Sequence, residues 1–343
     1  MTDVTIRGAG AFGLAVAWAC AKRGAKVRVI DPDGVGAGAS GGIVGALAPH
    51  VPEQWNAKKA FQFKALQMAE DWWAAVAEAG GGDPGYARSG RLQPLMDQPS
   101  VELAQARSNG AQELWEGYAT WTVEEAPEDW APVTETGLVI RDTLSARLHP
   151  RNACKALAAA LWRKGIAVGT ADEDSGAVVH ATGWRGMMEL SDRLGRTVGN
   201  GVKGQAALLE YDARNLPQIF ADGVHIVPHA NGTVAIGSTS ERDWTEEDTT
   251  DHQLSAIVAK ARQAIPALND APILERWAGV RPRAKSRAPM LGTHPLHDGQ
   301  FIANGGFKIG IGVAPLIGEV MADLILDGRD EIPEDFRPEA SGA

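Results

Sequence analysis

The stretch VTIRGAGAFGLAVAWACAKRGAKVRVID, residues 4–31, has the pattern of a strand, a tight turn, a helix and a second strand. Its turn contains Gly8, Gly10 and Gly13, which form the spacing G-x-G-x-x-G. In this fingerprint the first glycine permits the turn, the second lets a pyrophosphate approach the backbone, and the third lets the helix pack closely on the strand. The helix would point its N-terminal N–H groups at the phosphates. The stretch therefore predicts a dinucleotide site at the start of a Rossmann-like sheet.

Asp31 supports this interpretation because it ends the second predicted strand. A dinucleotide site places an acid roughly 20 residues after the glycine turn, where it binds a ribose hydroxyl, whereas an NADP site has an Arg nearby. Glycine-rich turns also arise for backbone reasons alone. The preceding strand, the Ala-rich helix and the acid together favour a ligand, and the acid favours an adenosine without a 2'-phosphate.

Length, charge and cysteine content limit the class of protein. A chain of 343 residues exceeds what one hydrophobic core usually serves, so we expect two domains. The net charge of −10 disfavours nucleic acid as a partner. No apolar run approaches the roughly 20 residues of a membrane helix, so we expect no membrane insertion. Cys20 and Cys154 lie in predicted helices, and no His or Cys spacing is typical of a metal site. Since the N-terminus also lacks the pattern of a signal peptide, we expect a cytoplasmic protein.

The periodicity of the remaining chain indicates two kinds of sheet. Helix and strand signals return together at residues 151–184, which is typical of a parallel sheet. Strand signals follow one another at 202–237, with the turn Asn231-Gly232 between two of them, which predicts an antiparallel sheet. We also expect a hairpin at 86–96. Long helices are predicted at 56–79, 252–264 and 312–327.

Several motifs along the chain occur in the order known from one protein family. They are GASG at 38–41 with Gly45 and Pro49, VVHATGW at 178–184, VKGQ at 202–205, HIVPHANGTVAIGSTSE at 225–241, WAGVRP at 277–282 with PMLG at 289–292, and NGGFKIG at 304–310. Together they resemble the FAD-dependent amine oxidases, a family that includes D-amino-acid oxidase, glycine oxidase and sarcosine oxidase. The resemblance covers nearly the whole chain.

The resemblance implies an α/β fold with a Rossmann-like FAD-binding domain, whose sheet is mostly parallel, and an antiparallel-sheet substrate domain, interleaved in sequence. The FAD-binding domain would comprise residues 1–52, 146–200 and 283–343, and the substrate-binding domain residues 53–145 and 201–282. No cysteine near residues 277–292 is placed to link a flavin, so the FAD is expected to be non-covalent.

The resemblance also assigns cofactor contacts. The residues expected to contact FAD are Gly8, Gly10, Ala11, Phe12, Gly13, Asp31, Ala39, Ser40, Gly45, Ala46, Thr182, Gly183, Gly305, Gly306, Phe307, Lys308 and Ile309. Reduced flavin carries negative charge, which a helix N-terminus and a cation stabilise. The loop at 305–310, which contains a lysine and leads into the last predicted helix, would supply both.

Arg281 and Lys308 are the predicted catalytic residues. A guanidinium can donate two parallel hydrogen bonds to a carboxylate, so Arg281 would orient the substrate; the alternative is a structural Arg before Pro282. Lys308 would partner either the flavin or the substrate carboxylate, and in the sarcosine-oxidase branch the matching residue serves the carboxylate. Arg283, Lys285 and Arg287 follow at a spacing of two, which would place them on one strand face. They form either a solvated basic strip or a site for a second anionic group.

The resemblance implies that the protein oxidises the CH–N bond of a small amino acid or N-substituted glycine, such as glycine, sarcosine or a D-amino acid. A hydride would pass to flavin N5, and the imine would hydrolyse. Three alternatives remain open. They are a dehydrogenase for a 2-hydroxy acid or phosphorylated alcohol, an enzyme that trims carboxymethylaminomethyl uridine in tRNA, and a flavin-binding subunit without turnover. The sequence predicts no oligomeric state.

Overall fold

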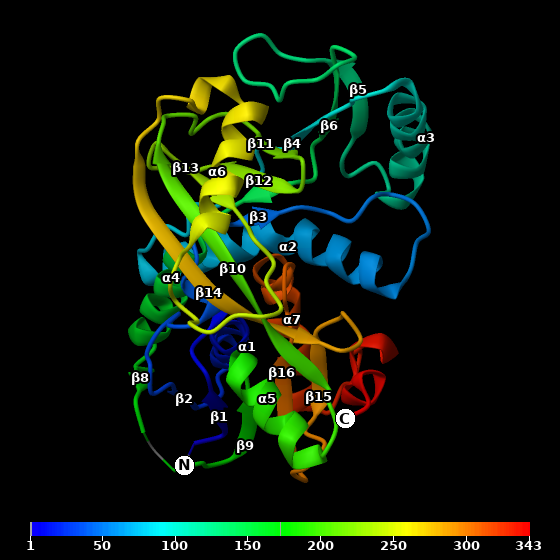
Figure 1. The fold of residues 1–343 in the computed structure, drawn as a ribbon. Helices are drawn as coiled ribbons and strands as arrows, with labels where there is room; N and C mark the ends of the chain where they lie inside the picture. The colour runs from blue at the N-terminus through cyan, green and yellow to red at the C-terminus, as the bar shows by residue number, and fades with distance from the viewer. Residues whose placement is uncertain (1, 172) are drawn as a thin grey trace.

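The computed structural model describes residues 2–171 and 173–343, and Met1 lies outside them. It has an α/β fold built on two large sheets, one at each end of the molecule (Figure 1). The first is a six-stranded sheet in the order β15-β16-β9-β1-β2-β8, and all its neighbouring strands are parallel except β15 and β16. Its strands are β1 (Val4–Arg7), β2 (Val27–Ile30), β8 (Val168–Gly169), β9 (Ala177–His180), β15 (Met290–Thr293) and β16 (Gln300–Asn304).

Helices cover this sheet because their small apolar residues allow close packing. Helix α1 (Ala11–Lys22) is buried along almost its whole length and packs on α4 (Pro150–Arg163) and α7 (Gly310–Asp327). Helix α2 (Ala57–Gly80) packs on α4 and α7, and it begins at Asn56, whose side chain accepts a hydrogen bond from the Lys59 N–H. The long helix expected at 56–79 is therefore confirmed.

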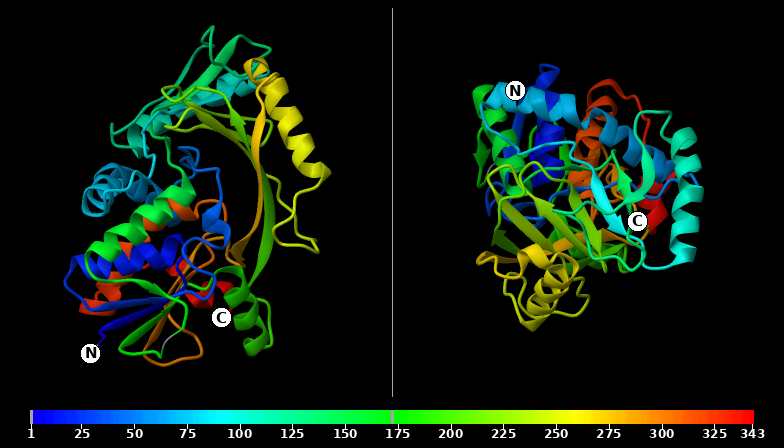
Figure 2. Two further views of the ribbon diagram at one scale, coloured as in Figure 1. Left: turned by 90° about the vertical axis from the view of Figure 1, so that its left-hand side faces the viewer. Right: turned by 90° about the horizontal axis from the view of Figure 1, so that it is seen from above.

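The second sheet has eight strands in the order β14-β10-β13-β12-β11-β4-β6-β5. All its neighbours are antiparallel except β4 and β11. Its strands are β4 (Arg91–Pro94), β5 (Trp121–Glu125), β6 (Leu138–Asp142), β10 (Gly199–Glu210), β11 (Gln218–Ala221), β12 (Val224–Pro228), β13 (Thr233–Gly237) and β14 (Ile273–Ala284). Helix α6 (His252–Ala264) contacts β10, β12 and β13, and α3 (Gln98–Leu114) contacts β5. Strands β10 and β14 are long and curve down toward the six-stranded sheet (Figure 2).

The smaller elements connect these layers. Helix α5 (Gly183–Leu194) contacts β10 and β14, and β3 (Ala46–Leu47) pairs with β7 (Ala146–Arg147). The short 3-10 helices of the described residues are η1 (Ala39–Gly41), η2 (Pro266–Leu268), η3 (Glu334–Phe336) and η4 (Pro338–Ser341).

Both sheets take strands from separate parts of the chain, so the two halves of the fold interleave as expected. The six-stranded sheet uses residues 4–30, 168–180 and 290–304, and the eight-stranded sheet uses 91–142 and 199–284. The exact domain boundaries stay predictions. Within residues 2–171 and 173–343, no helix is both long enough and apolar enough to cross a membrane.

The hairpin expected at 86–96 is wrong. Strand β4 pairs with β6 and β11, which lie far away in the sequence. The segment before β4 does not pair with it, because Ala87 forms a bridge with Arg147 and the Gly90 N–H donates a hydrogen bond to the Ser145 oxygen. After β4 the chain enters helix α3, which begins with a capping box: Asp97 accepts a hydrogen bond from the Ser100 N–H, and Ser100 Oγ accepts one from the Asp97 N–H.

Candidate functional site

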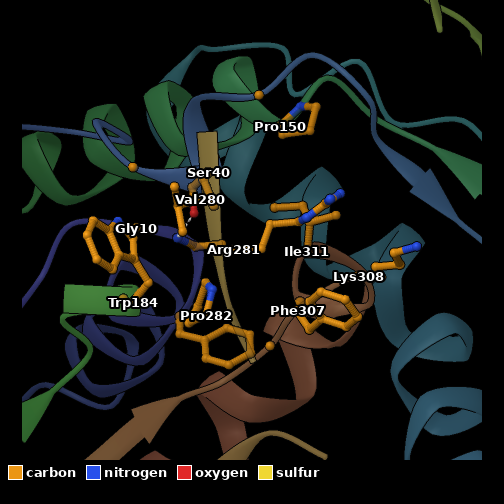
Figure 3. A pocket seen from close by; sticks show the side chains of 18 of the residues that line it. Gly10, Ser40, Pro150, Trp184, Val280, Arg281, Pro282, Phe307, Lys308 and Ile311 are labelled. Carbon is orange, nitrogen blue, oxygen red and sulfur yellow. Dashed lines mark hydrogen bonds between the residues drawn. The ribbon is translucent and has the colours of Figure 1, made fainter. Parts of the chain in front are cut away.

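A cavity of about 500 Å³ lies between the two sheets and takes its wall from both. The six-stranded sheet contributes the turn before α1, the segment around η1, the turn after β9 and the loop before α7. The eight-stranded sheet contributes residues of β10, β11, β12 and β14. Gly10, Ser40 and Trp184 lie toward one end of the cavity, and Phe307 and Lys308 toward the other (Figure 3).

The three fingerprint glycines have different roles. Gly8 has a φ of +111°, and an added Cβ would lie 2.2 Å from the Ala181 carbonyl oxygen. A Cβ on Gly13 would lie 1.9 Å from the Gly8 oxygen, so both glycines permit backbone contacts behind the cavity. Gly10 is different because it lines the cavity, where an added Cβ would meet only the Ser40 side chain, at 3.2 Å. Gly10 therefore keeps the backbone accessible from the cavity.

The start of helix α1 is arranged to receive an anion. The Ala11 N–H donates a 2.9 Å hydrogen bond to Ser40 Oγ, which attaches the η1 segment to the helix. The first-turn N–H groups of a helix have no acceptor within it, and they form its positive dipole end. Since Gly10, Ala11 and Phe12 line the cavity at this point, the start of the helix faces the cavity, which suits an anion such as a pyrophosphate.

Asp31 directly follows β2 and lines the same end of the cavity. Its Oδ2 accepts a hydrogen bond from the Ala9 N–H at 2.7 Å, and its Oδ1 accepts one from the Asp33 N–H at 3.0 Å. The carboxylate is thus held in position by the backbone. Because each carboxylate oxygen has a further lone pair, it can also accept a hydrogen bond from a ribose hydroxyl. The predicted ribose role therefore fits its place.

Most of the residues predicted to contact FAD line the cavity. They are Gly10, Ala11, Phe12, Asp31, Ala39, Ser40, Ala46, Thr182, Gly183, Gly305, Gly306, Phe307 and Lys308. Gly8, Gly13, Gly45 and Ile309 are not part of its wall. A Cβ on Gly45 would lie 1.8 Å from the Leu148 oxygen, and Ile309 stands at the N-cap of α7, so each supports the wall from behind.

Some wall residues had not been predicted. Phe220 of β11 stands in a local sequence that carries no signal of a site, whereas His225 of β12 and Ser238, directly after β13, lie within the motif quoted at 225–241. Trp184 and Trp277 also line the cavity, and both stand in quoted motifs that could have identified them. The Phe220 and His225 rings lie 4.7 Å apart because β11 and β12 pair with these two residues in register.

Arg281 forms part of the cavity wall and is fixed by the protein. Its Nη1 donates to Ser238 Oγ at 2.6 Å, and its Nη2 donates to the carbonyl oxygens of Thr239 at 2.7 Å and Lys203 at 3.3 Å. A Cβ on Gly204 would lie 2.2 Å from Nη2, so the glycine before Gln205 makes room for the guanidinium. With Nη2 engaged in this way, Nη1 keeps a donor for a carboxylate.

The charges near Arg281 change the pKa of several groups. Burial lowers the pKa of Arg281 to about 10, partly offset by Glu241, so it stays protonated at neutral pH. Burial lowers the pKa of Lys308, and the nearby charges of Arg281 and Arg283 lower it further. Burial, with the charges of Arg91 and Lys308, lowers the pKa of His225 to about 3, which keeps its imidazole neutral. This end of the cavity therefore attracts anions.

The prediction that Arg283, Lys285 and Arg287 share one strand face is wrong. Strand β14 ends at Ala284, and a turn follows in which Arg287 has a φ of +64°. Arg281 and Arg283 both reach the Phe307 ring, whereas Lys285 is exposed to solvent. A strand periodicity no longer applies once the chain leaves the sheet.

Neither cysteine nor metal chemistry is indicated in the described ranges. Cys20 and Cys154 are buried free thiols, and burial raises the pKa of each to about 12. Across residues 2–171 and 173–343, no group of three or more His, Cys, Asp or Glu side chains is arranged to hold a metal ion.

Comparison with known proteins gives a consistent result. Residues 3–324 match the family model described as DAO, FAD dependent oxidoreductase. Glycine oxidase from Geobacillus kaustophilus is 26% identical over 384 residues, covering 98% of this chain and 95% of that protein. Its crystal structure superposes with a TM-score of 0.82 at 22% identity, covering 98% of this chain and 97% of that chain. Iminodiacetate oxidase from Chelativorans sp. BNC1 gives a TM-score of 0.84 at 20% identity, covering 98% of both chains.

The family match spans far more than half of the chain, and the cavity has the glycine turn, helix N-terminus and acid that an extended dinucleotide requires. This chain therefore belongs to the DAO family of FAD-dependent oxidoreductases.

Proposed function

We propose that this protein oxidises the CH–N bond of a small amino acid or an N-substituted glycine. The family, together with relatives named glycine oxidase, supports FAD-dependent oxidation of an amine in the broad sense. The observation that carries the narrower proposal is that Arg281 and Lys308 line the same cavity as the dinucleotide cradle. A substrate with a carboxylate beside its amine matches Arg281, and Lys308 adds a second positive charge to the same cavity.

Residues at different positions around the cavity are proposed to contact different parts of the cofactor. Gly10 and Ser40, with the start of α1, hold the pyrophosphate, and Asp31 holds the ribose. The loop before α7 presents Lys308 and the helix N-terminus to the flavin end. When bound, FAD supplies the acceptor for the hydride that leaves the substrate Cα.

Arg281 orients the substrate by the carboxylate beside its amine, and Lys308 contributes to the orientation through its positive charge in the same cavity. Ser238 and Thr239 hold the guanidinium in one orientation, so the carboxylate is bound by a cation that need not rearrange. Holding a reactant in the productive geometry accounts for a large share of many catalysed rates. His225 stays neutral at physiological pH, so it does not place a third positive charge beside the amine. The imine product then takes up water and releases ammonia or the N-substituted amine together with an oxo acid.

We also propose that the protein works in a reducing compartment such as the cytoplasm. Its two thiols, Cys20 and Cys154, are free and lie on α1 and α4. Persistent disulfides are rare in such compartments.

Anaerobic titration of the FAD-loaded protein tests the proposed function. Glycine, sarcosine and D-alanine would be added separately while flavin absorbance is followed, with glycolate and lactate as the hydroxy-acid counterparts. We expect an amine to bleach the flavin and to yield its oxo acid, for example glyoxylate from glycine. Bleaching by hydroxy acids alone would select the hydroxy-acid alternative. Failure of every amine in a broad panel would contradict the proposal.

A further inference from the structure

Three cationic side chains surround the ring of Phe307 at the flavin end of the cavity. The Arg281 Cζ lies 5.7 Å from the ring centroid, the Arg283 Cζ 5.3 Å, and the Lys308 Nζ 5.7 Å. Phe307 is placed there by its N–H, which donates a 2.9 Å hydrogen bond to the Pro282 oxygen, and by the bridge between Arg283 and Gly306. The loop before α7 is thus attached to the end of β14, and the cations are held together.

No carboxylate among the described residues forms an ion pair with any of these three cations. The side chains of Arg283 and Lys308 have no hydrogen-bond partner there either, whereas Arg281 is held by Ser238 and Thr239. Lys58, at the start of α2, adds a fourth positive charge nearby, and its Nζ donates to the Arg287 oxygen at 2.5 Å. Burial, with the charges of Arg287 and Arg283, lowers the pKa of Lys58.

Such a cluster stays repulsive until an anion neutralises it. Burial is the main cause of the lowered pKa of Lys308, and the charges of Arg281 and Arg283 add to it through that repulsion, although Glu241 offsets part of the charge effect at Arg281. One substrate carboxylate against Arg281 would leave the other two cations without a partner. At about 3.4 Å per residue, side chains two positions apart on β14 are about 7 Å apart, so one anion does not serve both arginines equally.

The position of the cations shows where a second anion would lie. Lys308 forms part of the cavity wall. Arg283 does not, and its guanidinium lies over the Phe307 ring from outside the wall. A second acid group would therefore contact the Lys308 ammonium directly. Arg283 would act through its charge, which is partly buried and so only partly screened by solvent.

We propose that Lys308 and Arg283 form a second anion subsite beside Phe307, so that the preferred substrate is an amine with two carboxylates. This proposal rests on the proposed amine oxidation. Two classes of compound are amines with two carboxylates of this kind: N-carboxyalkyl glycines and acidic D-amino acids. In either one, Arg281 holds the carboxylate next to the reacting carbon, and the subsite holds the other.

Matched substrates test the proposal on the FAD-loaded protein. Sarcosine and iminodiacetate differ by one carboxylate, and so do D-alanine and D-aspartate. In one of the two pairs, we expect kcat/KM to be at least about tenfold higher for the diacid than for the monoacid. The pair that shows this difference tells whether the substrate is an N-carboxyalkyl glycine or an acidic D-amino acid. Equal or faster oxidation of the monoacid in both pairs would overturn the proposal.

Two variants separate the subsite from general effects of charge or folding. Arg283→Gln should lower kcat/KM for the diacid by about tenfold, mainly by raising its KM. The kcat/KM for the monoacid should change less than about twofold. Lys285→Gln is the matched control, because Lys285 is an exposed cation just beyond the end of β14. This variant should leave kcat/KM unchanged for both the diacid and the monoacid. An equal loss for both substrates in Arg283→Gln would indicate a structural role and overturn the proposal.

Binding of non-reacting acids gives a readout that does not depend on turnover. Malonate and acetate also differ by one carboxylate, and calorimetry on the FAD-loaded protein should show tighter binding of malonate, lost in Arg283→Gln. If this holds while no amine reduces the flavin, the proposed function fails and the subsite remains. If malonate binds no tighter than acetate and Arg283→Gln has no effect, the subsite is wrong whichever amines react.

Discussion

At the scale of the residue, two missing Cβ atoms create the space that this site uses. Gly10 leaves the backbone before α1 open to the cavity, and Gly204 leaves room for the Arg281 guanidinium. The first opening faces a ligand, and the second faces a side chain of the protein itself. A substitution at each position should therefore disturb a different part of the function.

Gly10→Val should weaken FAD binding without unfolding the protein. The φ of Gly10 is −83°, which a β-branched residue tolerates, but its methyl groups would extend toward Ser40 and into the cavity. We expect the dissociation constant for FAD, measured by flavin fluorescence on the apoprotein, to rise by about tenfold or more. The melting temperature of the apoprotein should change little. Unchanged FAD affinity would show that the phosphates do not approach the backbone here.

Gly204→Ala should impair the substrate step and leave the cofactor bound. The added Cβ would lie 2.2 Å from the Arg281 Nη2, so the guanidinium must move away from Thr239 and Lys203. We expect kcat/KM for the best amine to fall by about tenfold to a hundredfold, with the FAD content of the purified protein unchanged. Full activity in this variant would contradict the role of a fixed Arg281.

At the scale of the element, the contact between α1 and α7 holds the dinucleotide turn in place. A Cβ on Gly318 of α7 would lie 2.7 Å from the Ala15 oxygen of α1, so the helices are in close contact at this point. Arg23, just after α1, forms ion pairs with Glu319 at 3.0 Å and Asp323 at 2.6 Å. Small residues bring the helices together, and the ion pairs join their ends.

Gly318→Ala and Gly312→Ala form a matched pair within α7. The first should destabilise the protein by about 1–3 kcal/mol, because the contact with Ala15 has no space for a methyl group. The second should be neutral or stabilise by up to about 1 kcal/mol, since its Cβ would lie 3.6 Å from the Leu47 side chain and alanine favours a helix. Chemical denaturation measures both. If both variants change the free energy of unfolding equally, the close contact with Ala15 does not determine the cost of an added methyl group.

At the scale of the whole molecule, the cavity exists because two separately built sheets face one another. The largest hydrophobic cluster packs around the six-stranded sheet and its helices and extends to β5 and β6, and a second lies between α6 and the eight-stranded sheet; β10 and β14 run between the two sheets. Buried histidines lie in the region where these parts meet. The rings of His149 and His229 are 4.7 Å apart, and His229 Nε2 lies 2.8 Å from the Ile43 oxygen.

Acid should destabilise the fold partly through His229. Burial, with the nearby His149, lowers its pKa from 6.5 to about 4. The unfolded chain therefore takes up a proton first as the pH falls below about 6.5, and stability is lost progressively toward pH 4. At pH 5 this amounts to about 1–2 kcal/mol.

The measurement is the free energy of unfolding between pH 7.5 and 5. His229→Gln should reduce its dependence on pH, whereas His252→Gln, a change at an exposed position, should retain it. If both variants lose stability with pH as the unsubstituted protein does, His229 does not contribute to the acid response.

Local sequence was sufficient for features that depend on neighbouring residues. The turn around Gly10 and the start and end of α2 follow from glycine conformations, caps and apolar periodicity within a few residues. The family resemblance added Arg281 and Lys308, and both line the cavity. Their roles in binding and catalysis remain predictions.

Long-range pairing decided what local sequence could not. The expected hairpin failed because the partners of β4 are distant in the chain, and the row of cations after Arg281 ended where β14 leaves the sheet. His225 lines the cavity because the pairing register of β11, β12 and β13 places it there. The sequence by itself determined the cofactor turn and the long helices, because these depend on contacts within a few residues. Only the tertiary structure decided which side chains share the cavity with Arg281, because strand register and the facing of the two sheets depend on the packing of the whole chain.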